Sequence, residues 1–106
     1  MRPEKLNEVR KSLAAIGHRS MINYDIWYRG TENEINHYTG SDMPHVYDFM
    51  PKVKVELVVR DDEVGTIADT ICDAACTDHT GDGKIFVMPV ETAVRIQTRE
   101  RGDTVV

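Results

Sequence analysis

Along this 106-residue chain, apolar residues are spaced every three or four positions in some segments, as in helices, and every two positions in others, as in strands. The order of these segments restricts the chain to a fold in which helices pack on a sheet. From about Pro3 to Ile16, apolar residues recur every three or four positions, and Gly17 stands where a left-handed helix cap falls. This spacing predicts a helix. A second helix is predicted after Asp61 and Asp62, because carboxylates suit a helix N-terminus. Its apolar stripe comprises Val64, Ile67, Ala68, Ile71, Cys72 and Ala75.

Alternating apolar and polar residues predict a strand on either side of an unpatterned stretch. The first strand is expected over Met21 to Trp27 and the second, clearer one over Lys52 to Val59, with one buried and one partly wet face. Between them, the residues from about Arg29 to Val46 show no lasting period. A structureless loop of this length in a small domain is usually functional. The alternative is a disordered hairpin tip without a role.

Two further strands are expected near the end of the chain. Ile85 to Val90 forms a third apolar run, although Pro89 argues against a central place for that end of it, and Val94 to Thr98 has the pattern of a short strand. The order is then helix, strand, loop, strand, helix, strand. One strand in front would complete βαββαβ. We therefore predict a single α+β domain over residues 1–106, a ferredoxin-like split βαβ that apparently lacks its first strand.

Composition narrows the class of protein. A net charge of −5 disfavours a nucleic-acid binder, which needs clustered Lys and Arg. The sequence has no apolar run of the roughly 20 residues that span a bilayer, and its first residues do not form a signal peptide. Two cysteines cannot form a secreted disulfide framework. We expect a small cytoplasmic domain whose core is marginal alone, so that oligomerisation is favoured.

The segment TDHTGDGK, residues 77–84, is the strongest candidate for a binding site. It is not a Walker A loop, because Lys84 is followed by Ile85 and a strand. It is not a calcium loop either, because Pro89 stands where a bidentate glutamate is required. Two interpretations remain. The segment is a tight Asp-Gly turn, or its glycines let backbone N–H groups approach a phosphate while Lys84 supplies charge.

Metal and nucleophile chemistry are weakly indicated. Cys72, Cys76 and His79 have a C-x3-C-x2-H spacing with no clear fourth ligand, and Cys72 is expected to be a buried, inert thiol. His37 and His45 are metal ligands only where the long loop folds around an ion. No spacing suggests a nucleophile with its base.

Three blocks of the sequence resemble the signature blocks of the PII signal-transduction family, the small nitrogen regulatory proteins. They are RPEKLNEVRKSLAAIG near the start, DFMPKVKVELVV in the middle and TGDGKIFVMPVETAVRIQT towards the end. The resemblance covers nearly the whole chain in order and spacing, and the second and third blocks are specific when they occur together.

The resemblance implies a regulator rather than an enzyme, a homotrimer that binds ATP or ADP between subunits. It also implies a protein partner, an ammonium transporter or a metabolic enzyme, that docks on a T-loop at about residues 29–46. Gly81, Asp82, Gly83 and Lys84 match the family's phosphate loop, and Arg95 matches an arginine that reaches a phosphate across the interface. Lys52 matches the lysine after the T-loop, and Glu56 and Val58 match positions that line the nucleotide cleft.

Three departures from the family pattern bear on the ligand. Gln97 replaces the second arginine of the last strand, which removes a charge-assisted bond of about 1.5–3 kcal/mol and shifts the preference towards ADP or AMP. No glutamine stands at the T-loop entrance, which disfavours Mg²⁺ and 2-oxoglutarate. His45 takes the place of the modified tyrosine, with Tyr38 and Tyr47 out of register.

The leading hypothesis is a nucleotide-binding PII-like regulator. The alternatives are a nucleotide-free interaction module on the same trimer scaffold and, last, a metal-responsive variant that uses His37, His45 and Cys76. Against the family pattern, the sequence also begins where a first strand should have ended. We expect either an upstream strand beyond the recorded start or a sheet rebuilt by trimer contacts.

Overall fold

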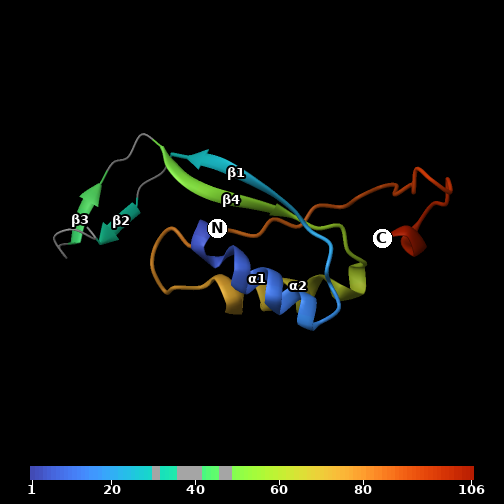
Figure 1. Cartoon of the computed structure of the whole chain (residues 1–106), viewed down its shortest axis with the longest axis horizontal. Coiled ribbons are helices and arrows are strands. Elements are labelled where there is room, and N and C mark those ends of the chain that lie inside the picture. The colour runs from blue at the N-terminus through green and yellow to red at the C-terminus, as the bar shows by residue number, and fades with distance from the viewer. Residues whose placement is uncertain (30–31, 36–41, 46–48) are drawn as a thin grey trace.

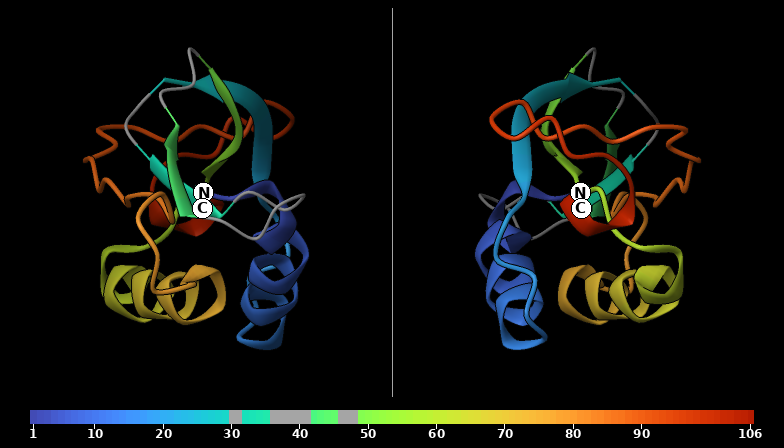
Figure 2. Two further views of the ribbon diagram at one scale, coloured as in Figure 1. Left: turned by 90° about the vertical axis from the view of Figure 1, so that its left-hand side faces the viewer. Right: turned by 90° about the vertical axis from the view of Figure 1, so that its right-hand side faces the viewer.

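Two helices lie side by side beneath a two-stranded antiparallel sheet (Figure 1). The structure, a computed structural model, describes residues 1–29, 32–35, 42–45 and 49–106. The helices are α1 (Leu6–Ala15) and α2 (Val64–Ala75), and the strands of the sheet are β1 (Ile22–Tyr28) and β4 (Met50–Glu56). The two end-on views show the helices as one layer and the sheet as the other (Figure 2). The predicted α+β, ferredoxin-like class is confirmed.

Both predicted helices form, each preceded by a single 3-10 turn. The turn before α1 spans Pro3–Lys5, and Gly17 follows the helix with a φ of +94°, the left-handed cap that the sequence predicted. The turn before α2 spans Asp61–Glu63. The carboxylates expected at the start of this helix, Asp61 and Asp62, do not cap it through hydrogen bonds, because no side-chain cap forms there. The carboxylates of this turn contribute only their charge.

The sheet pairs β1 with β4 in a register that runs from Ile22 opposite Glu56 to Tyr28 opposite Met50. The chain between these strands carries a second hairpin, which pairs β2 (Glu32–Ile35) with β3 (Asp42–His45). The expectation of a structureless stretch is therefore wrong for these two segments. The predictions for His37, Tyr38 and Tyr47 lie outside the described residues, as do those for the side chain of His45.

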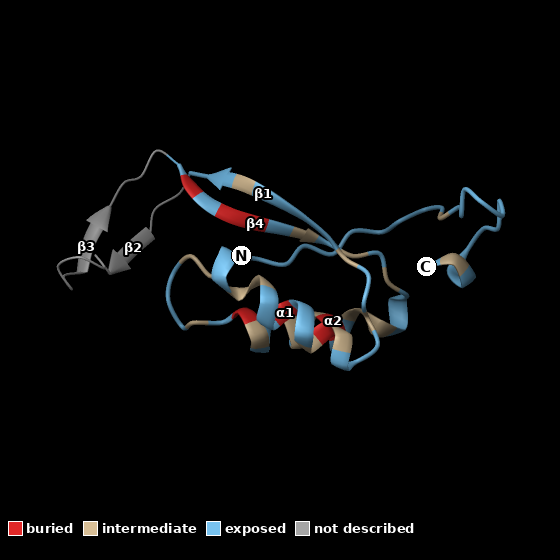
Figure 3. Ribbon diagram, in the orientation of Figure 1, coloured by how far each residue is buried: buried red, intermediate tan, exposed pale blue. Residues whose placement is uncertain are grey.

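The core lies between the two helices. Val9 and Leu13 of α1 are fully buried and contact Ile67 and Ala75 of α2. Partly buried side chains surround this cluster: Met1, Met21, Leu57, Val59, Ile71 and Ala74. Burial on β4 is concentrated near its start, and most of β1 is exposed (Figure 3). The two-stranded sheet therefore covers one side of the helix pair, and the other side of the helices faces solvent in the single chain.

Lys52 departs from the expected alternation on β4. Lys52 is only 7% exposed, although the alternating pattern predicted that it lies on the partly solvated face of the strand and Val53 on the buried face. Its ammonium donates to the backbone oxygen of Gly81 at 2.7 Å. A charged side chain is buried at low cost only when it is paired, so this contact explains the exception.

Met1 lies along the edge of β4 that faces away from β1. Its backbone exchanges two hydrogen bonds with Val53, one from the Met1 amine to the Val53 oxygen at 2.8 Å and one from the Val53 N–H to the Met1 oxygen at 2.9 Å. Two residues bonded in this way form a hydrogen-bonded antiparallel pair. The segment that begins α1 is thus tied to the middle of strand β4, along its outer edge.

The two strands predicted near the end of the chain do not form. Residues 85–92 have no strand partner in the described part of the molecule, and Val94 makes only an isolated bridge to Arg101. A strand is held by the backbone groups of a neighbour, so an apolar run alone does not define one. The chain instead passes beyond the sheet and ends in a 3-10 turn, Asp103–Val105 (Figure 1).

Leu13→Ala tests the helix interface. Because Leu13 is fully buried, we expect the free energy of unfolding to fall by about 2–5 kcal/mol in urea denaturation. Asn7→Ala, at an exposed position of the same helix, should change it by less than about 0.5 kcal/mol. Equal effects of the two variants would contradict the proposed core.

Candidate functional site

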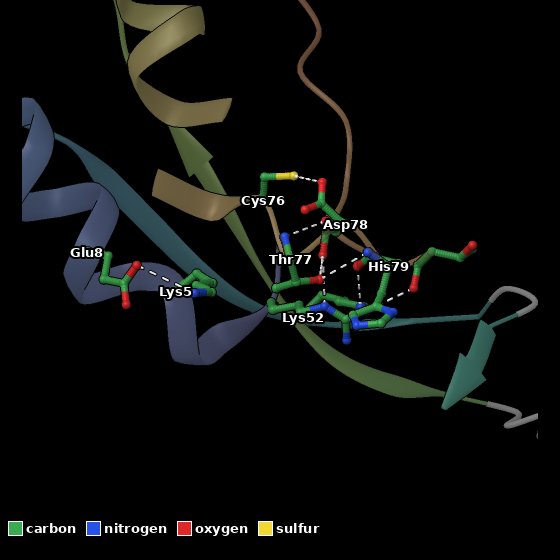
Figure 4. A network of polar contacts seen from close by, with 11 residues as sticks. Lys5, Glu8, Lys52, Cys76, Thr77, Asp78 and His79 are labelled. Atoms are coloured by element: carbon green, nitrogen blue, oxygen red, sulfur yellow. Dashed lines mark hydrogen bonds and ion pairs between the residues drawn. The ribbon is translucent and has the colours of Figure 1, made fainter. Parts of the chain in front are cut away.

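The loop that leaves α2, residues 77–84, is held against the start of the chain and β4 by polar contacts (Figure 4). Three of its residues have left-handed backbone angles: Asp78 at a φ of 62°, Gly81 at 103° and Gly83 at 113°. A Cβ on Gly83 would lie 3.2 Å from the Cα of Met1. Glycine is therefore required at position 83 both by its φ and by the close approach of Met1.

The Asp82 carboxylate is the internal anchor of this loop. It accepts hydrogen bonds from the Thr77 N–H at 2.7 Å, from the Thr77 hydroxyl and from Arg2 Nε at 3.0 Å. Partial burial tends to raise the pKa of Asp82, but the hydrogen bonds from Thr77 and the charge of Arg2 outweigh it and hold this pKa well below its usual range. Asp82 is thus ionised at neutral pH.

Two cations hold consecutive carbonyl groups of the loop. Arg2 Nη2 donates to the Thr80 oxygen at 2.8 Å, and Lys52 Nζ donates to the Gly81 oxygen. Lys84 is exposed at the end of the loop, and for the N–H groups of Gly83 and Lys84 no acceptor is found among the described residues. Backbone donors beside a lysine ammonium are suited to an anion.

The remaining predicted site residues of the middle block lie on or just after β4. Lys52 is brought to the loop, but Glu56 is exposed and faces Lys54 at 3.1 Å and the Tyr24 hydroxyl at 3.4 Å. Val58 follows the strand with 57% of its surface exposed. Within the described part of one chain, no hydrogen bond or ion pair joins either residue to residues 77–84.

Arg95 belongs to a different part of the molecule. Its N–H donates to the Glu100 oxygen at 2.9 Å, and its guanidinium lies 4.0 Å from the Glu100 carboxylate. The segment from Val94 to the C-terminus extends beyond the end of the sheet opposite the 77–84 loop (Figure 1). A single chain therefore does not bring Arg95 and the loop together.

The two cysteines differ from the sequence prediction. Cys72 was expected to be buried on the apolar stripe of α2, but it is exposed, as is Cys76. The helix turns its stripe towards α1 through Ile67 and Ala75, which places Cys72 at the margin. The Cys76 thiol lies 3.3 Å from an Asp78 carboxylate oxygen. Over the part of the chain that the structure describes, no three His, Cys, Asp or Glu side chains are grouped for a metal ion.

Arg2 is part of the site but was not singled out as a site residue from the sequence, and Thr77 was included only as the first residue of the segment TDHTGDGK. Arg2 belongs to no glycine-rich motif and lies 80 positions before Asp82. The only available signal was the isolated carboxylate within a predicted phosphate loop, since an acidic residue there needs a compensating cation.

A sheet over two antiparallel helices, with a projecting hairpin and a glycine-rich loop at the sheet edge, is typical of a ferredoxin-like domain (Figure 1). A family model described as nitrogen regulatory protein P-II matches residues 1–100. The chain belongs to this family, whose members are regulators of nitrogen metabolism.

Individual relatives agree with this assignment. Nitrogen regulatory protein P-II 2 of Methanothermobacter thermautotrophicus is 43% identical over 103 residues, which cover 96% of this chain and 88% of the relative. Nitrogen regulatory protein P-II 1 of Escherichia coli K12 is 40% identical over 109 aligned positions, with 100% and 94% covered. The crystal structure of Arabidopsis thaliana PII bound to citrate matches with a TM-score of 0.75 and 34% identity, over 97% of this chain and 80% of that one. Among the described residues, the helices are too short and too polar to cross a bilayer.

Asp82→Asn tests the anchor through pH. The folded-state pKa of Asp82 is depressed, so its ionisation stabilises the fold above about pH 4, and this contribution is lost as the pH falls further. We expect the variant to be less stable than the native chain at pH 7, and the difference to shrink at pH 3, in urea denaturation. Asp73→Asn, at an exposed position of α2, should show no such pH dependence. A difference that is equal at both pH values would contradict the anchor.

Proposed function

We propose that this chain is a nucleotide-binding signal-transduction protein that regulates a partner through the T-loop at residues 29–46. The loop of Gly81, Asp82, Gly83 and Lys84 would hold the phosphates of ATP or ADP in a cleft between subunits of a homotrimer. The observation that carries this proposal is the glycine-rich loop with Lys84 at its end, where the N–H groups of Gly83 and Lys84 have no acceptor among residues 1–29, 32–35, 42–45 and 49–106. Such donors stabilise an anionic polyphosphate by charge-assisted hydrogen bonds.

The position of Arg95 supports a site shared between copies. The segment that contains Arg95 lies at the opposite end of the molecule from the 77–84 loop (Figure 1). Arg95 and this loop can therefore contact one nucleotide only when they come from different subunits. The chain also exposes an apolar segment that a second copy would cover. Its exposed members are Phe86, Val87, Met88, Val90, Val94 and Ile96.

The remaining roles follow the family pattern. Lys52, which contacts Gly81, would connect the nucleotide loop to the base of the hairpin, and Glu56 and Val58 would line the cleft. Gln97 favours ADP or AMP over ATP, and the T-loop entrance disfavours Mg²⁺ with 2-oxoglutarate. We infer a cytoplasmic regulator without catalytic activity, whose partner is an ammonium transporter or a metabolic enzyme.

Lys84→Ala tests nucleotide binding. In titration calorimetry with ATP, ADP and AMP, we expect the native chain to bind at least one nucleotide and the variant to bind it about tenfold or more weakly, because a charge-assisted bond is lost. Lys11→Ala, at an exposed position of α1, should bind as the native chain does. No heat with any of the three nucleotides would overturn the proposal and favour a nucleotide-free interaction module.

Ile96→Asp tests the assembly. Analytical ultracentrifugation of the native chain should give three times the chain mass. The variant should dissociate, because Ile96 is 93% exposed in one chain and a buried carboxylate is costly. Thr98→Asp, an exposed polar position of the same segment, is the control. A native chain that sediments as a monomer would contradict the trimer.

A further inference from the structure

Asp82 is an unexpected residue in a site for an anion, because a free carboxylate repels phosphate. Its side chain is 22% exposed, and both of its oxygens are engaged inside the molecule. Oδ2 accepts from the Thr77 N–H at 2.7 Å, and Oδ1 accepts from Arg2 Nε at 3.0 Å and from the Thr77 hydroxyl. The carboxylate therefore serves the loop and has little capacity left for a ligand.

Arg2 contacts the loop at two points with one guanidinium group. Nε binds Asp82, and Nη2 donates to the Thr80 backbone oxygen at 2.8 Å. The side chain of Arg2 is 16% exposed, and its bond to Asp82 is partly buried, which weakens screening by salt, whereas its bond to Thr80 is exposed. The rigid planar fork of arginine suits this geometry, which a lysine ammonium cannot reproduce in full.

These contacts determine which groups of the loop remain available. The carbonyl of Thr80 is taken by Arg2 and that of Gly81 by Lys52, at 2.8 Å and 2.7 Å. The exposed residues that follow, Gly83 and Lys84, have N–H groups without an acceptor in the described part of the chain. The carbonyl oxygens that would repel an anion are thus neutralised, and the donors are left for it.

We propose that Arg2 is a positioning residue of the phosphate loop, which neutralises the Asp82 carboxylate and holds it inward so that Gly83 and Lys84 can bind an anionic nucleotide. This inference rests on the proposed nucleotide binding. It assigns to Arg2 an indirect role, because the hydrogen bonds that Arg2 donates from Nε and Nη2 both end on the loop and not on a ligand. Substitution of Arg2 alone leaves the charge of the Asp82 carboxylate uncompensated beside the phosphates. Substitution of both Arg2 and Asp82 removes this charge as well.

The test is a double-variant cycle measured by titration calorimetry with ATP and ADP. Arg2→Gln should weaken binding about tenfold or more, because the uncompensated Asp82 charge then faces the phosphates. Asp82→Asn should weaken it less, since an amide oxygen still accepts from Thr77. The double variant should bind like Asp82→Asn alone, and Arg2→Lys should recover part of the affinity. Arg10→Gln, an exposed arginine of α1, is the control.

The outcomes separate this inference from the proposed function. A native chain that binds none of ATP, ADP and AMP overturns the proposed function. A native chain that binds while Arg2→Gln binds equally well, or losses that simply add in the double variant, overturns the role of Arg2. Hydrogen exchange gives a second measurement without a ligand: the Thr77 amide should exchange faster in Arg2→Gln and Arg2→Lys than in Arg10→Gln. Unchanged exchange in both variants also overturns the inference.

Discussion

The geometry of the candidate site depends on a single carboxylate, that of Asp82. Its hydrogen bonds join Arg2, in the segment before α1, to Thr77 at the start of the 77–84 loop, and so hold that loop against the beginning of the chain. A loop with three left-handed residues has no regular backbone bonding to hold it. The ionised Asp82 carboxylate holds the loop instead, because it accepts several hydrogen bonds at once. These bonds fix the backbone that leads to the exposed end of the loop.

The helices and strands whose buried face follows from a regular spacing of apolar residues were predictable from the sequence. The spacing of Val9 and Leu13, and the glycine at position 17, predict the 3-10 turn and α1 together, over residues 3–15. Alternation predicts a strand over residues 52–59, and the observed β4 begins two residues earlier and ends three residues earlier. The segment at residues 85–90 could not be assigned in this way. Its composition is that of a strand, but strand formation depends on a neighbouring backbone, which no local pattern encodes.

The candidate site was predictable in its residue types and not in its contacts. Gly81, Gly83 and Lys84 stood out because glycines and a lysine suit a phosphate loop. The burial of Lys52 and the inward turn of Asp82 both depend on partners far away in the sequence, 29 and 80 positions distant. Contacts between residues so far apart leave no periodic pattern in the sequence, so these two pairs can be identified only from the folded structure.

The long separation between Arg2 and Asp82 has a consequence for the order of events during synthesis. The two residues are 80 positions apart, so the guanidinium waits for its partner until the chain through residue 82 has left the ribosome. The core of α1 and α2 assembles from residues that emerge earlier, from Val9 to Ala75. The carboxylate that shapes the 77–84 loop is therefore synthesised after every residue of the buried cluster, although the arginine that it binds is among the first residues of the chain.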